Sequence, residues 1–175
     1  MPTNPGIHHQ DTDYIPMGSI GAWNEIKRFK PFGTRDQFGD YLKIDRVLIE
    51  TVASMREFAG HPFHVLCGSE ARPRNKGWHP KHQALDGYFD NIHPLEMYEI
   101  AQRFDKFNGI GVYLWWTGYN GLVTGGIHLD TRPKVMARSY DARWGQVTKH
   151  GAYMPVKIEF LRQAVVLNLP REKRQ

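Results

Sequence analysis

Hydrophobic residues between Thr34 and Ala59 recur at three- and four-residue steps, which predicts one amphipathic helix. Thr34 and Gln37 have the spacing of a capping box at its start. Gly60 suits the left-handed position that ends a helix, and Pro62 prevents its continuation. The apolar positions of this helix are Ile44, Val47, Leu48, Val52, Met55 and Phe58.

A second helix is predicted from Pro94, which suits a first helical turn, to a stop at Asn108 and Gly109. Shorter alternating or apolar runs between turn residues predict strands. These runs cover 63–67, 83–90, 110–117 and 122–130. The stretch 132–146 has no clear period and is expected to be irregular, and 156–169 fits either a strand or a helix.

Together these elements predict an α+β fold in which helices flank a small antiparallel sheet. The 175 residues are expected to form one domain over 34–170, with an N-terminal arm over 1–33 and a basic tail over 171–175. The single cysteine, Cys67, excludes an internal disulfide, and its apolar neighbours predict a core position. Residues 1–10 lack a signal-peptide pattern and no apolar stretch approaches ~18 residues, so we expect synthesis in the cytoplasm and no membrane span.

Two stretches carry the candidate chemistry. His79 lies just before one predicted strand, and Asp86 lies on that strand. His128 and Asp130 point to the same face of another predicted strand. A catalytic zinc takes three protein ligands, for which His and carboxylate are suited, and leaves one position for water. Activation of that water needs a general base, for which Asp130 and His82 are the local candidates, although Asp130 could instead orient a ligand histidine.

The order of the motifs carries more information than either stretch alone. The motif with His79, Ala84 and Asp86 is followed by Gly-Ile-Gly-Val-Tyr at 109–113 and by Gly-Ile-His-Leu-Asp at 126–130, with Arg-Trp at 143–144. This pattern resembles the zinc D-Ala-D-Ala carboxypeptidase and L-alanyl-D-glutamate endopeptidase family of peptidoglycan peptidases. The resemblance implies a hedgehog/DD-peptidase-like fold, Zn²⁺ as cofactor, and His79, Asp86 and His128 as its ligands.

The chain also departs from the family pattern. His82 stands at the motif glycine, and Gly125 stands where many members have an acid that acts as base. The loop that begins at Cys67 lacks the family's substrate-binding arginine, which Arg72 or Arg74 is expected to replace.

Three aromatic residues could line a cleft for peptide or glycan. These residues are Tyr113, Trp115 and Trp116. The formal charge of +5 suits an anionic partner such as cell wall.

The leading hypothesis is therefore a zinc peptidase that hydrolyses peptide bonds in bacterial peptidoglycan, encoded by a bacteriophage and acting at the wall as a lysin or virion component. The main alternative is a non-catalytic virion module that binds other virion proteins and keeps the fold and metal. A non-haem iron oxygenase is a third, because H-x-D with a distant histidine such as His150 forms a facial triad, but the two long helical patterns argue against it. Nucleic-acid binding is not expected, because no groove-reading motif accompanies the charge.

Overall fold

The computed structural model of the chain describes residues 42–68, 77–119, 121–133 and 142–168. The expected arm over 1–33, the capping box at Thr34 and the basic tail lie outside these ranges. Within them, no helix is long and apolar enough to cross a lipid bilayer.

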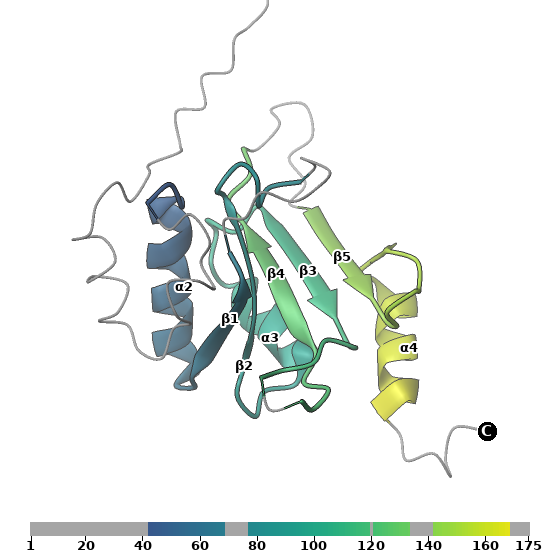
Figure 1. Cartoon of the computed structure of the whole chain (residues 1–175). Coiled ribbons are helices and arrows are strands. Elements are labelled where there is room, and N and C mark those ends of the chain that lie inside the picture. The colour runs from purple at the N-terminus through teal and green to yellow at the C-terminus, as the bar shows by residue number, and fades with distance from the viewer. Residues whose placement is uncertain (1–41, 69–76, 120, 134–141, 169–175) are drawn as a thin grey trace, which may run out of the picture.

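The centre of the fold is a mixed six-stranded sheet with the order β1-β2-β4-β3-β5-β6 (Figure 1). All neighbouring strands run antiparallel except β3 and β5, which are parallel. The strands are β1 Phe63–Cys67, β2 Ala84–Phe89, β3 Gly109–Tyr113, β4 Gly126–Asp130, β5 Ala142–Gln146 and β6 Met154–Pro155. The α+β class is confirmed, whereas the expectation of a purely antiparallel sheet is wrong.

Strand β5 accounts for that error, because it lies in the stretch expected to be irregular. Its sequence, Ala-Arg-Trp-Gly-Gln, has no run of apolar residues, and three of its five residues are only half-buried. Its strand conformation comes from pairing with β3 along its whole length. Such a tertiary pairing leaves no local signal in the sequence.

Helix α2 (Arg46–Ala59) starts later than its hydrophobic pattern predicts, because residues 42–45 form a turn and a bridge. Asp45 is the N-cap, and its carboxylate accepts a hydrogen bond from the Val47 N–H at 3.1 Å. The other oxygen of Asp45 accepts a hydrogen bond from the Thr131 hydroxyl. The predicted stop is confirmed, because Gly60 follows the helix with a φ of 67°.

The other two described helices begin near the expected positions. Helix α3 (Pro94–Ala101) starts at Pro94 with His93 as N-cap, but it ends one to two turns before the predicted stop. The open choice for 156–169 resolves as helix α4 (Ile158–Asn168). Phe160 of α4 packs over Gly145 of β5, where any side chain would collide with its ring.

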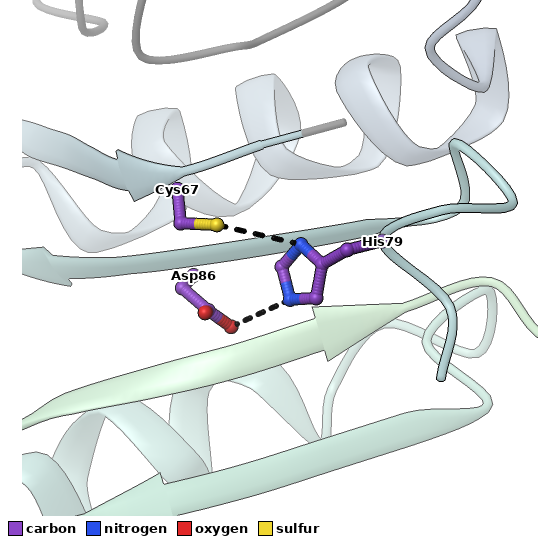
Figure 2. Close-up of side chains that lie close together, drawn as sticks. All are labelled: Cys67, His79 and Asp86. Atoms are coloured by element: carbon purple, nitrogen blue, oxygen red, sulfur yellow. Dashed lines mark hydrogen bonds and ion pairs between the residues drawn. The ribbon is translucent and has the colours of Figure 1, made fainter. Parts of the chain in front are cut away.

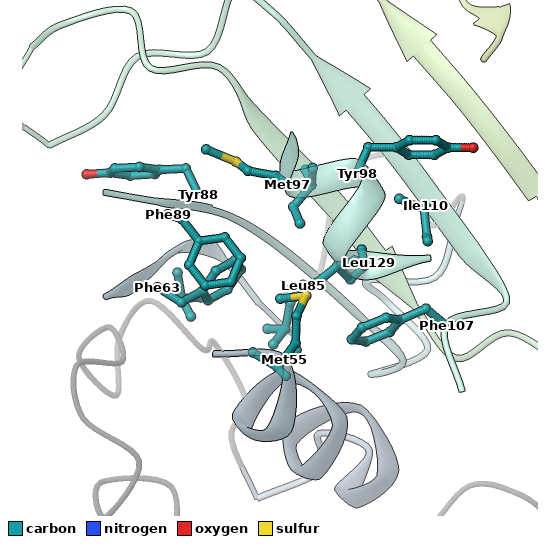
Figure 3. Packing of buried hydrophobic residues seen from close by; sticks show 14 of the residues in the cluster. Met55, Phe63, Leu85, Tyr88, Phe89, Met97, Tyr98, Phe107, Ile110 and Leu129 are labelled. Carbon is teal, nitrogen blue, oxygen red and sulfur yellow. The ribbon is translucent and has the colours of Figure 1, made fainter. Parts of the chain in front are cut away.

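The two faces of the sheet have different chemistry. One face carries Leu85, Ile110 and Leu129 and forms a single buried core with α2 and α3. Figure 3 shows Met55 of α2 and Met97 of α3 around this layer. Because side chains alternate along a strand, the intervening residues Asp86, His128 and Asp130 lie on the opposite face.

Candidate metal centre

The pairing of β2 with β4 brings two of the expected ligands together. Asp86 lies directly opposite His128 in the antiparallel register. His79 comes from the turn before β2, where the His82 N–H donates to the His79 carbonyl at 2.9 Å. His82 holds this turn with a φ of 63°, which explains why a glycine suits the position.

Three donor atoms of these side chains converge on one point. The Asp86 Oδ1 lies 2.7 Å from His128 Nδ1 and 3.1 Å from His79 Nε2, and the two nitrogens are 3.2 Å apart. The three residues are only 5–8% exposed. Ligands of a tetrahedral zinc stand about 3.3 Å from one another, given bonds of about 2.0–2.1 Å. The spacing of the three atoms therefore fits a small metal ion.

The outer nitrogen of each imidazole determines which nitrogen faces the centre. His79 Nδ1 lies 2.7 Å from the Gly68 carbonyl oxygen, which can only accept, so this nitrogen carries a proton. His128 Nε2 likewise lies 3.0 Å from the Asp130 carboxylate. In the neutral rings, the inner nitrogens, His79 Nε2 and His128 Nδ1, then carry lone pairs. These lone pairs face each other and the Asp86 carboxylate oxygen. Such an arrangement of acceptors requires a cation between them, either a proton or a metal.

The pKa values of the three side chains also indicate that the centre needs a cation. Burial alone would lower the pKa of His79, but hydrogen bonds with Asp86 and Cys67 outweigh it and raise that pKa to about 9. Burial is likewise outweighed at His128, where Asp130 and Asp86 raise the pKa to about 9. Burial would raise the pKa of Asp86, but the two imidazoles hold it far below its usual range. The site therefore attracts positive charge strongly.

Cys67 lies beside the centre, and its position corrects the expectation of a core residue. A β-bulge between Val65 and Cys67 places Cys67 opposite Asp86, so it is half-buried on the face of the centre. Cys67, His79 and Asp86 form a group that could hold a metal ion, with donor atoms within 4.8 Å of one another. Figure 2 shows that the thiol and the carboxylate approach opposite nitrogens of the His79 ring.

This geometry favours His128 over Cys67 as the third donor of the centre. One ion binds one nitrogen of a given imidazole. The Cys67 sulfur lies 3.7 Å from Nδ1, the nitrogen already hydrogen-bonded to the Gly68 carbonyl. His128 instead meets Nε2, on the same side as Asp86.

Asp130, one of the two expected general bases, is fully buried behind His128. Both of its oxygens are also bound by the Arg132 guanidinium, and Arg132 Nε donates to Oδ1 at 2.7 Å. Burial would raise the pKa of Asp130, but Arg132 and His128 lower it. These contacts favour the other expected role, in which Asp130 orients a ligand histidine.

Two glycines of β3 make room for this arrangement. Gly109 lies opposite Asp130 and Gly111 lies opposite His128. A Cβ at Gly109 would enter the Asp130 carboxylate, and one at Gly111 would come within 2.6 Å of the Trp144 ring. Trp144 fills the space over Gly111 and lies against the His128 ring, with centroids 5.2 Å apart. The Gly-Ile-Gly pattern of β3 is thus a packing requirement of the centre.

The three aromatic residues expected to contact substrate pack mainly on one another. The Tyr113 ring stacks on Trp116 with centroids 4.0 Å apart, and Trp115 is edge-on to both rings. Tyr113 is connected to the centre through Trp144, whose indole N–H donates to the Tyr113 hydroxyl at 3.1 Å. Burial raises the pKa of Tyr113, so its hydroxyl stays protonated. The aromatic group therefore adjoins the centre through Trp144.

The remaining expected site residues have different outcomes. Arg72 and Arg74 lie outside the described residues. His82 belongs to the turn that carries His79, and its side chain is half-buried. Sequence reasoning missed Arg132 and the Gly68 carbonyl. Arg132 had a usable signal, because it continues the two-residue period of His128 and Asp130.

The centre is thus a buried site of two histidines and a carboxylate on the polar face of a mixed sheet. A hydrogen-bond acceptor holds the outer nitrogen of each imidazole, the Gly68 carbonyl for His79 and Asp130 for His128. The donor set suits Zn²⁺, which takes nitrogen and carboxylate ligands. A scan against protein-family models, a search of curated proteins and a search of solved structures each found no match to this chain.

Proposed function

We propose that the protein is a zinc-dependent peptidase that hydrolyses peptide bonds in bacterial peptidoglycan. The observation that carries the metal part of this proposal is the triangle of donor atoms from His79, Asp86 and His128, with sides of 2.7–3.2 Å. The sequence resemblance to peptidoglycan peptidases of the hedgehog/DD-peptidase fold carries the substrate part. The order of helix, strands and ligand-bearing turn in the described residues is consistent with it.

Bound zinc would supply a water of lowered pKa and a Lewis acid for the peptide carbonyl. The chain's own residues hold the three donors in place. The Gly68 carbonyl keeps the Nδ1–H of His79 outward, and Asp130 does the same for the Nε2–H of His128. Both histidines thereby present a lone pair to the same point without any rearrangement.

The place of action follows from the same proposal. A peptidoglycan peptidase encoded by a phage acts at the wall, either as a released lysin or as part of the virion. The net charge of +5 supports this, because positive charge favours association with an anionic wall.

The surroundings of Gly125 and Asp130 support a second candidate function, a non-catalytic virion module with a structural metal. Gly125 has a φ of 64°, and a Cβ there would collide with Pro94, so this position does not accept the acid that serves many family members as base. Asp130 is bound by Arg132 and His128. Neither position therefore offers a carboxylate beside the proposed zinc water.

The test combines metal analysis with digestion of purified peptidoglycan. The purified protein should contain one zinc per chain and should release new amino groups from peptidoglycan, measured by chemical labelling. Zinc without release would favour the module, and absence of zinc would reject both functions.

The histidine variants give this test its control. His128→Ala and His79→Ala should each abolish zinc binding. His64→Ala is the matched control, because His64 also pairs with an aspartate, Asp90 at 2.9 Å, away from the centre. That variant should keep one zinc per chain.

A further inference from the structure

Arg132 is bound to Asp130 more extensively than a surface ion pair would be. Its Nε donates to Asp130 Oδ1 at 2.7 Å, its Nη2 donates to Oδ2, and its backbone N–H donates to Oδ1 at 3.2 Å. The Asp130 side chain is fully buried, and that of Arg132 is 26% exposed. A two-point contact of this kind fixes the plane of the carboxylate, not only its charge.

Two indole rings hold the guanidinium itself. Its Cζ lies 5.4 Å from the Trp78 ring centroid and 5.2 Å from that of Trp144. Both distances are within the range of cation–π attraction. Trp78 immediately precedes His79, and Trp144 lies against His128. Arg132 therefore contacts the neighbours of both histidine donors.

The carboxylate that Arg132 fixes also contacts the Nε2 of His128 at 3.0 Å. Asp130 can hold the Nε2–H of His128 only while one of its oxygens points at that nitrogen. Without the guanidinium, a fully buried carboxylate would lose its counter-charge and its orientation together. The ring of His128 would then lose the contact that keeps its Nδ1 directed at Asp86 and His79.

We propose that Arg132 is a positioning residue of the metal centre, which acts through Asp130 to hold His128 in its ligating orientation and so sets the metal affinity. This inference rests on the metal site of the proposed function, but it does not depend on peptidase activity. Removal of groups behind a metal ligand commonly weakens metal affinity by about 10–100-fold.

The test is the zinc Kd of Arg132→Gln, measured by competition with a chromophoric chelator. We expect it to rise about 10–100-fold relative to the wild type. The visible spectrum of the cobalt-loaded protein should also change, because that spectrum reports the geometry of the ligand shell. Arg132→Lys keeps the charge without the two-point contact and should give an intermediate Kd.

Arg143→Gln is the matched control. Arg143 is also half-buried and lies on strand β5, but its guanidinium donates to the carbonyls of Phe107, Asn108 and Ala142. This variant should lose stability without a change in zinc Kd or cobalt spectrum. If Arg132→Gln does not fold, Arg132→Lys against Arg143→Lys provides the same comparison.

The outcomes distinguish failure of the positioning role from failure of the metal site. Unchanged zinc Kd in the Arg132 variants would overturn the positioning role while leaving the metal site intact. An equal loss of affinity in the Arg132 and Arg143 variants would also overturn it, because the effect would then be general destabilisation. A wild-type protein that binds neither zinc nor cobalt would overturn the metal site of the proposed function, and the positioning role with it.

Discussion

Zinc binding to the metal-free protein should release protons, because the metal replaces protons that the two ligand histidines hold. Burial opposes protonation of both rings, but Asp86 and Cys67 raise the pKa of His79 to about 9, and Asp130 and Asp86 raise that of His128 to about 9. A group with such a pKa is about 99% protonated at pH 7, whereas an ordinary histidine is protonated about a quarter of the time. Zinc must displace whichever inner protons the two rings hold.

The two rings share one carboxylate, Asp86, so protonation of one disfavours protonation of the other. We therefore expect between one and two protons released per zinc at pH 7, against about half a proton for two ordinary histidines. Titration calorimetry in buffers of different ionisation enthalpy measures this number directly. A release of half a proton or less would refute the view that Asp86 draws positive charge onto both rings.

The same pKa shifts give the metal-free fold a defined pH dependence. A raised histidine pKa contributes stability that is fully present below pH 6.5 and is lost as the pH rises through about 9. The lowered pKa of Asp86 contributes stability that is present above pH 3.8 and is lost on acidification through that lowered value. For one histidine, a rise in pKa from 6.5 to about 9 corresponds to roughly 3 kcal/mol of folding stability. The Tm of the metal-free protein should fall between pH 6.5 and 9.

Three substitutions test other parts of the centre. Gly111→Ala puts a Cβ within 2.6 Å of the Trp144 ring, so denaturant titration should show a loss of about 1–3 kcal/mol in the free energy of unfolding. An unchanged midpoint would mean that the indole moves freely. Cys67→Ser should leave the zinc Kd nearly unchanged, because the thiol approaches the outer nitrogen of His79. For the same reason, the cobalt-loaded wild type should lack a strong thiolate absorption band. Such a band would place sulfur among the ligands. His82→Gly should keep or raise the free energy of unfolding, because glycine adopts a φ of 63° without the strain of roughly 1 kcal/mol that histidine has there. A clear loss of stability would show that the imidazole contributes packing.

The parts of the structure that could be predicted are those with a local pattern. The stop of α2 at Gly60 and the start of α3 at Pro94 follow from the backbone preferences of these residues. The alternation along β2 and β4 correctly placed Asp86 and His128 on polar faces. The start of α2 was missed because Asp45, the actual cap, is held by a hydroxyl 86 residues away.

The missed parts of the centre depend on tertiary contacts in the same way. A strict two-residue period would put Cys67 on the same face as Val65, and the bulge in β1 reverses this. The parallel pairing of β3 and β5 brings Trp144 over Gly111, although 33 positions separate them in the chain. No single segment of the sequence contains either arrangement.

Asp45 has a consequence for how the molecule opens. Its backbone N–H donates to the His82 carbonyl at 2.8 Å, and its carboxylate accepts from Thr131, so the start of α2 is joined to the segments that follow His79 and His128. Undocking of the helix start would release both histidine-bearing segments in one step. Hydrogen exchange should therefore show the amides of Asp45 and Thr131 opening as one cooperative unit, which metal binding slows as a whole.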